Sequence, residues 1–157
     1  MEVELDESKF GKRKYNRGHA VEGVWVLGGV ERTPERKLFL VAVPDRSQAT
    51  LEGVISRHVL PGSIILTDLW KGYSGLSQHF DYTHQSVNHS LQFIDPETGT
   101  HTNTIEGTWS GVKVGIPKRN RVAGEIDDHL FEFIWRRTNA SDLWGAFLHA
   151  LHEVSYE

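Results

Sequence analysis

Residues 101–113 read HTNTIEGTWSGVK. Within this stretch Glu106 and Lys113 are seven positions apart, close to two helical turns, so a helix would place both side chains on one face. Trp109 lies on the same side, three positions after Glu106, where its ring could brace the pair. Two residues typical of a helix N-cap come before them, Asn103 and Thr104. The stretch therefore predicts a helix that presents a carboxylate and an ammonium together.

Two aspartates far upstream are placed to join this carboxylate. Asp6 ends the alternating run VELD, and Asp68 ends the apolar run SIILTD of residues 63–68. The second run is typical of a strand buried on both faces, and open α/β sheets bind ligands at the carboxyl ends of their strands. Three acids on two strands and a later helix suit two divalent ions, because magnesium and manganese prefer oxygen ligands. Two such ions clamp the attacking and leaving oxygens of a displacement at phosphorus.

The order Asp6, Asp68, Glu106 and Lys113 resembles the catalytic domain of DDE-type transposases. The wording of the motifs is closer still to the ISXO-like insertion-sequence transposases and their eukaryotic Merlin relatives. The matching phrases run through almost the whole chain: VELDESKFGKRKYNRGH, GGVER, PDRSQATL, LTDLWKGY, VNHSLQFIDPETGTHTNTIEGTWSGVK and HLFEFIWRR. The resemblance implies an α/β fold with an RNase H-like mixed sheet of about five strands flanked by helices. It also implies that residues 1–157 form a single catalytic domain.

The same resemblance implies an enzyme that cleaves DNA strands and transfers them to new sites. Asp6, Asp68 and Glu106 would bind two Mg²⁺ or Mn²⁺ ions, which activate water and then a DNA 3′-hydroxyl. Lys113 would contact substrate phosphate near the scissile bond. Cleavage and transfer would both be in-line attacks at phosphorus, catalysed mainly by positioning and charge neutralisation.

Each acid also has an ordinary structural interpretation. The three acids can be unrelated surface residues, since acids in soluble domains are mostly exposed. Asp68 is also typical of an N-cap for the short helix or turn expected over residues 70–76. Asp95 is a rival third acid, although Asp-Pro followed by Glu-Thr-Gly is typical of a turn. Glu7 is left out of the site, because neighbouring residues of a strand point to opposite faces and Asp6 is taken to point inward.

Two basic clusters accompany these acids along the chain. The net charge is −4, so the molecule as a whole does not attract nucleic acid, and DNA binding must depend on local clusters. Runs of this kind are either solvated loops or contacts to DNA phosphates. The candidate phosphate contacts are Lys9, Lys12, Arg13, Lys14, Arg17, Lys118, Arg119 and Arg121.

The composition of the chain indicates where in the cell the protein is expected and which kinds of partner it can bind. The chain has no cysteine, which excludes thiolate zinc ligands and internal disulfides and fits an intracellular protein. We expect it in the nucleus if eukaryotic, and in the cytoplasm or nucleoid if bacterial. No apolar run is long enough to span a bilayer, so no membrane partner is expected. The nine histidines do not match HExxH, and we interpret them as structural, solvated or substrate-contacting, not as a zinc site.

Hydrophobic periodicity supplies the remaining elements. Strands are expected over residues 3–6, 21–30, 37–43, 63–66 and 82–88, and helices over residues 47–58, 105–116, 124–138 and 142–154. The apolar stripes of the last two helices are predicted to be core.

The chain starts only a few residues before Asp6, where family members carry an upstream DNA-recognition region. We therefore expect that region to be absent, and a homo-oligomer or a targeting partner to supply recognition of DNA ends. Two other functions stay open: a catalytically silent DNA- or protein-binding module derived from a transposase, and a nuclease of the same fold that cuts without strand transfer.

Overall fold

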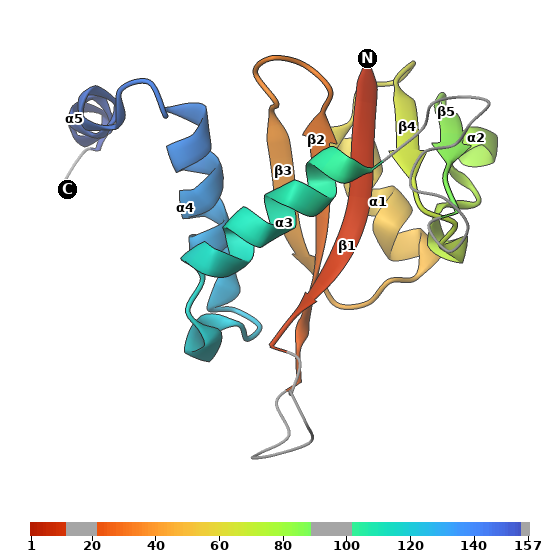
Figure 1. Cartoon of the computed structure of the whole chain (residues 1–157), viewed down its shortest axis with the longest axis horizontal. Helices are drawn as coiled ribbons and strands as arrows, with labels where there is room; N and C mark the ends of the chain where they lie inside the picture. Colours follow the sequence, from red (N-terminus) through yellow and green to blue (C-terminus); the bar gives the residue numbers. More distant parts are fainter. Residues whose placement is uncertain (12–21, 89–101, 155–157) are drawn as a thin grey trace.

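The computed structural model describes residues 1–11, 22–88 and 102–154. Within them, five strands form one mixed sheet in the order β3-β2-β1-β4-β5 (Figure 1). The strands are β1 (Glu2–Phe10), β2 (Val24–Glu31), β3 (Leu38–Val43), β4 (Ile64–Thr67) and β5 (Thr83–Ser86). The first three pair antiparallel as a meander, whereas β4 is parallel to both β1 and β5.

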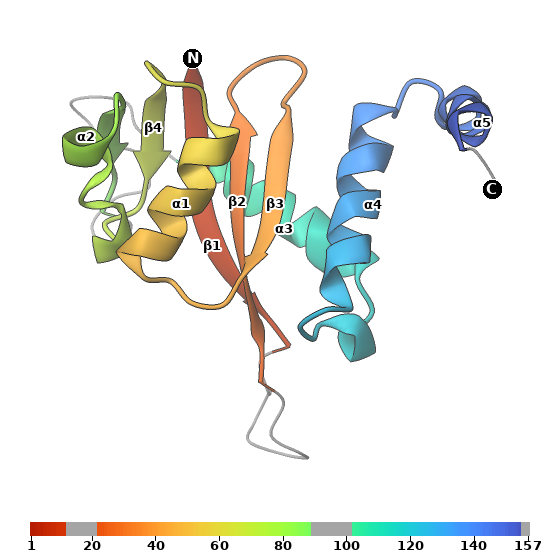
Figure 2. The same cartoon turned by 180° about the vertical axis from the view of Figure 1, so that it is seen from behind.

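Helices cover both faces of this sheet. In Figure 1, α3 (Asn103–Gly115) crosses the front face, and Figure 2 shows α1 (Gln48–His58) on the opposite face. Next to α3, α4 (Ile126–Thr138) packs against β3. The remaining elements are η1 (Lys71–Tyr73), α2 (Leu76–His79), η2 (Lys118–Asn120) and α5 (Leu143–Glu153). This α/β sheet with flanking helices confirms the predicted fold class and is consistent with an RNase H-like fold.

Alternation along the central strand divides the core into two layers. Val3 and Leu5 of β1 point towards α1 and join one buried cluster, whereas Phe10 joins the cluster under α3. Residues two apart share a face, so Glu4 and Asp6 lie on the same side as Phe10. The strand thus supplies a hydrophobic layer behind it and two carboxylates to the helix in front.

The helix α1 follows from its sequence as predicted. Ser47 is its N-cap, and the Ser47 hydroxyl accepts a hydrogen bond from the Thr50 backbone N–H. Leu51, Val54 and Ile55 are buried against the sheet. Leu60, expected to continue this stripe, is instead 67% exposed because the helix ends at His58.

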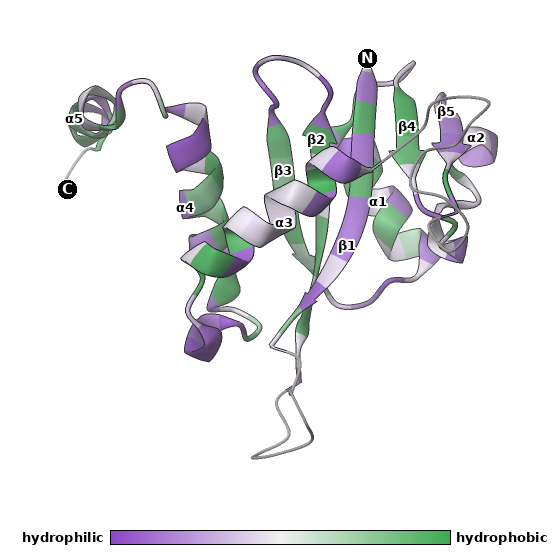
Figure 3. Cartoon of the chain, viewed as in Figure 1, coloured by the Kyte–Doolittle hydropathy of each residue, from purple (hydrophilic) through white to green (hydrophobic). Residues whose placement is uncertain are grey.

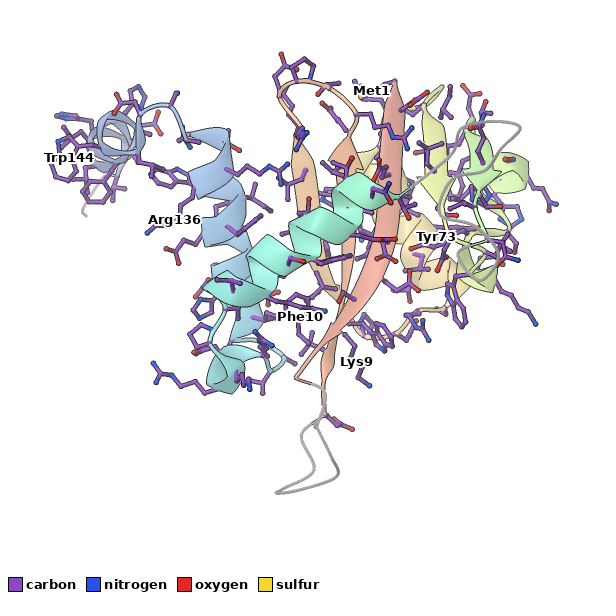
Figure 4. All side chains as sticks on the ribbon, viewed as in Figure 1. Met1, Lys9, Phe10, Tyr73, Arg136 and Trp144 are labelled. Carbon is purple, nitrogen blue, oxygen red and sulfur yellow. The ribbon has the colours of Figure 1, made fainter. Side chains whose placement is uncertain are left out.

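Two further expectations are corrected. The strand β1 runs on to Phe10, so Lys9 lies within a strand and not in the expected loop. The apolar residues of α5 are not core: within the described part of the chain this helix has no buried residue and no extensive contact with another element. Figure 3 shows that many of its residues are hydrophobic, and Trp144, labelled in Figure 4, is 68% exposed. None of the described helices is long and apolar enough to cross a membrane.

Candidate active site

The sheet brings Asp6, on β1, close to Asp68, which directly follows the neighbouring strand β4. β1 and β4 pair in parallel, with Glu4 opposite Leu66. Extending that register by two residues sets Asp6 level with Asp68, which directly follows β4. Adjacent strands lie about 4.8 Å apart, so the two carboxyl groups are close enough to interact.

The environment of Asp6 disfavours its negative charge. The pKa of Asp6 is raised from its ordinary 3.8 to about 7, mainly by burial and also by the charges of Glu7 and Asp68, while a hydrogen bond from Trp109 opposes the shift. A cation beside this carboxylate would offset both its burial and the repulsion. The donor chemistry therefore fits a hard divalent ion.

Asp68 also stabilises the turn that follows it. One carboxylate oxygen, Oδ1, accepts a hydrogen bond of 2.9 Å from the Trp70 backbone N–H. This is an Asx-type turn; the 3-10 helix beyond it begins at Lys71 without a side-chain cap. Within the described residues the second oxygen accepts no hydrogen bond. Asp68 can thus hold its turn and still offer an oxygen to a ligand.

Glu4 holds the N-terminus of α3 from the neighbouring strand. This fully buried carboxylate accepts hydrogen bonds of 2.9 Å from the backbone N–H groups of both Thr104 and Ile105. Its other oxygen accepts a 2.8 Å bond from Arg32 Nε. We expected capping by Asn103 or Thr104; instead the N-cap position is Thr102, which makes no side-chain capping bond. Sequence reasoning missed Glu4, although its two-residue spacing from Asp6 on one strand face was a usable signal.

Trp109 connects α3 to Asp6. Its indole Nε1 donates a 2.9 Å hydrogen bond to Asp6 Oδ2, and its ring meets Phe10 edge-on at 6.0 Å between centroids. The ring lies over Gly28, where an added Cβ would come within 2.8 Å of Trp109 Cη2. Trp109 therefore braces the aspartate, and not the Glu106–Lys113 pair as expected.

Glu106 and Lys113 lie on one flank of α3, as their spacing predicts. The residues facing α4 include Thr108 and Gly111, and helical geometry puts the pair on the other flank. Glu106 is exposed, and Thr102 Oγ1 donates a 3.2 Å bond to its carboxylate. Lys113 is half-buried, with Nζ 5.4 Å from the centre of the Phe10 ring.

The described residues contain no group of three His, Asp or Glu side chains that could hold a metal ion. The structure thus brings Asp6 and Asp68 together without gathering Glu106 into a complete three-acid centre. Asp95, the rival third acid, lies outside the described residues. A site built from Asp6, Asp68 and Glu106 stays a prediction.

A second network supports the site from the opposite sheet face. Glu7 points away from Asp6, as expected, and accepts hydrogen bonds from the Tyr73 hydroxyl and from Arg46 Nη1 at 3.1 Å (Tyr73 is labelled in Figure 4). Burial, with the nearby carboxylates, raises the pKa of Tyr73 well above its usual value. The Arg46 guanidinium lies between the rings of Trp25, at 4.0 Å, and Trp70, at 4.1 Å. This stack links the turn after Asp68 to β1.

The basic residues divide by environment. Lys9 is exposed beside Trp25, and Lys118 and Arg119 are exposed on η2. Arg121 instead donates to the backbone carbonyls of Lys113 and Ile116 and so closes the C-terminus of α3. The other candidates lie outside the described residues: Lys12, Arg13, Lys14 and Arg17. All the DNA-contact roles stay predictions.

Two comparisons show which known proteins this chain is similar to. A family model described as the ISXO2-like transposase domain matches residues 2–137. An "Uncharacterized transposase-like protein" of Haemophilus influenzae is 32% identical over 105 residues, which is 66% of this chain and 83% of that protein. The family match includes Asp6, Asp68, Glu106 and Lys113, and it ends before α5.

Proposed function

The chain belongs to the ISXO2-like transposase domain family, and from this we propose that it is a DDE-type catalytic domain that cleaves and transfers DNA strands. The observation that supports the proposal is the closeness of Asp6, on β1, to Asp68, which directly follows the neighbouring strand β4. The same proposal includes a specific likeness to the Merlin elements. It also includes an intracellular setting in which DNA is the partner.

We assign the metal ligands to Asp6, Asp68 and Glu106. When bound, two Mg²⁺ or Mn²⁺ ions would supply activation of the attacking oxygen and neutralisation of charge at phosphorus. The protein's part is to fix the ligands before substrate arrives. Trp109 orients Asp6 by its hydrogen bond, and Glu4 anchors the first turn of α3, from which Glu106 extends.

Lys113 is assigned to the substrate and not to the metals. Its ammonium lies two turns after Glu106 on the same flank of α3, so it can contact a phosphate of a strand held by the metals. The ring of Phe10 beneath it favours the cation and restricts where the side chain can lie.

A metal-dependent nicking assay tests this proposal. Supercoiled DNA is incubated with the protein and Mg²⁺ or Mn²⁺, and pre-cut element ends are supplied in parallel to detect strand transfer. Asp68→Asn should abolish both reactions, whereas Asp128→Asn, which removes an exposed acid on α4, should retain them. Equal nicking by wild type and Asp68→Asn would refute the assigned site. Nicking without transfer would favour a nuclease of the same fold.

One observation favours a second candidate, a catalytically silent binding module derived from a transposase. The described acids do not include a gathered group of three, and a DNA-binding descendant would not need one. This candidate predicts DNA binding without nicking at any Mg²⁺ or Mn²⁺ concentration, and equal binding by wild type and Asp68→Asn.

A further inference from the structure

An open groove of about 540 Å³ lies on the flank of α3 that faces away from Glu106 and Lys113. Its walls come from three segments: the turn between β2 and β3, the helix α3, and the C-terminal half of α4 (Figure 1). Two arginines from different segments line it, Arg36 of the turn and Arg137 of α4. The groove is separate from the acids of the candidate active site.

Neither arginine has a carboxylate partner among the described residues. Among the described residues, the Arg137 side chain donates only to the Thr108 hydroxyl, at 3.4 Å from Nη1. Other arginines differ sharply: Arg32, Arg46 and Arg136 each form an ion pair with a glutamate. Two cations facing one groove without a counter-charge leave a local excess of positive potential.

The environment of Arg137 carries an energetic cost that an anion would remove. Burial lowers the pKa of the Arg137 guanidinium, and the positive charge of Arg36 lowers it further. The two guanidinium groups are thus near enough to repel each other. A dianion or a phosphodiester between them would offset both the burial of Arg137 and its repulsion by Arg36, because guanidinium groups bind phosphate oxygens through paired N–H donors.

The backbone at Arg36 is also held in an uncommon conformation. Its φ is +47°, a left-handed value that costs a residue with a side chain about 1–2 kcal/mol. The turn maintains it through bonds from the Arg36 N–H to the Thr33 carbonyl, at 3.1 Å, and to the Thr33 hydroxyl, at 3.2 Å. The turn therefore presents Arg36 to the groove at the expense of local strain.

We propose that this groove is a second phosphate-binding site, in which Arg36 and Arg137 hold a backbone phosphate of nucleic acid away from the catalytic centre. Phe133 offers an apolar wall to a sugar, and the Thr108 hydroxyl, which donates to the Thr104 carbonyl and accepts from Arg137, helps to position the Arg137 guanidinium. Gly107 leaves its part of the wall open, since an added Cβ there would meet nothing within 4 Å. The inference rests on the proposed function only for DNA as the source of the phosphate.

The salt dependence of DNA binding tests the site. A short labelled duplex of arbitrary sequence is titrated by fluorescence anisotropy in EDTA at roughly 50 to 200 mM salt. The double variant Arg36→Gln/Arg137→Gln should flatten the plot of log affinity against log salt by about 0.9, because the site neutralises one phosphate, and each single variant should give part of that change. The matched control is Arg136→Gln: Arg136 (labelled in Figure 4) is adjacent in sequence, exposed and paired with Glu132.

Working in EDTA separates this site from the catalytic proposal, because binding is measured whether or not the protein cleaves DNA. The control should leave the slope within error of wild type. If the double variant keeps the wild-type affinity and slope, and the second measurement below is also unchanged, the proposal is overturned.

A second measurement identifies the source of the phosphate and controls for folding. Sodium pyrophosphate should raise the thermal midpoint of the wild type but not of the double variant. Loss of this effect together with the flatter DNA slope supports a nucleic-acid backbone site. Loss of the pyrophosphate effect with an unchanged DNA slope supports the same phosphate chemistry with a small-molecule source. Without any anion, Arg137→Gln should be at least as stable as wild type, because the change removes repulsion; a purely structural arginine would give a loss.

Discussion

Replacing Glu4 by glutamine should destabilise the protein far more than a surface change. The fully buried Glu4 carboxylate accepts from two backbone N–H groups of α3 and from Arg32. Glutamine has one acceptor oxygen, so its amide group must face a donor, either Arg32 or the helix N-terminus. Breaking a buried charge pair costs about 3–5 kcal/mol; Arg32 retains Glu2, so we take about 3 kcal/mol.

The chain offers a matched control on the same arginine. Glu2 also pairs with Arg32, at 3.2 Å, but its side chain is 46% exposed. An exposed pair contributes at most about 1 kcal/mol, so Glu2→Gln should change the free energy of unfolding by less than that. The two variants remove the same charge from the same strand and differ mainly in burial.

Urea denaturation followed by tryptophan fluorescence measures both variants. With a slope near 2 kcal/mol per molar urea, Glu4→Gln should lower the midpoint by about 1.5 M. A domain with about 5–15 kcal/mol of stability would remain folded in water. The five tryptophans of the chain, including Trp109 beside Asp6, together report the unfolding. If Glu4→Gln and Glu2→Gln differ by less than about 1 kcal/mol, Glu4 does not anchor α3 as described.

Three other changes test the site. The pKa of Asp6 is raised in the folded state to about 7, so the metal-free protein should lose stability as pH rises from about 4 through 7, by at most about 4 kcal/mol. Urea titrations at several pH values should show no such loss in Asp6→Asn. An equal loss in the variant would contradict the assignment to Asp6. Gly28→Ala should lower the stability measured by thermal denaturation by about 1–3 kcal/mol, because the new Cβ would press on Trp109. Gly53→Ala in α1 is the control: nothing lies within 4 Å of its new Cβ, so it should stabilise the protein by up to about 1 kcal/mol. Lys113→Ala should weaken DNA binding about tenfold, since one charged hydrogen bond is worth about 1.5 kcal/mol or more. In this variant Mg²⁺ or Mn²⁺ should still raise the thermal midpoint. Loss of that metal effect as complete as in Asp68→Asn would place Lys113 among the metal ligands.

The sequence could predict what depends on local pattern. Alternation in residues 3–6, the cap at Ser47 and the apolar run before Asp68 each follow from neighbours in the chain, and the structure confirms these elements. Asp6 and Asp68 each end a strand-like run in the sequence, but β1 continues to Phe10, so only Asp68 lies at the end of its strand.

Contacts between distant residues could not be predicted in the same way. Glu4 accepts hydrogen bonds from backbone N–H groups about 100 positions later in the chain. Nothing in the sequence near Asn103 indicates that α3 lacks a local side-chain cap. The periodicity of residues 142–154 correctly indicates an amphipathic helix, but periodicity does not say whether a surface exists to cover it. The same limit applies to Glu106, whose distance from the aspartates depends on how α3 lies across the sheet.

The two carboxylates on one face of β1 have a mechanical consequence. Glu4 holds the first turn of α3 on the central strand, and Asp6 holds the second turn through Trp109. β1 and α3 are thus joined at two points and move as one rigid unit, which carries both Asp6 and Glu106. Asp68 stands outside that unit, on a turn held by Trp70 and its stack on Arg46. The separation of Asp6 and Glu106 is therefore set by how α3 lies on β1, and Asp68 is the ligand whose position can adjust, through residues 68–70. Loosening the Arg46 stack would shift Asp68 without altering any of the three acids.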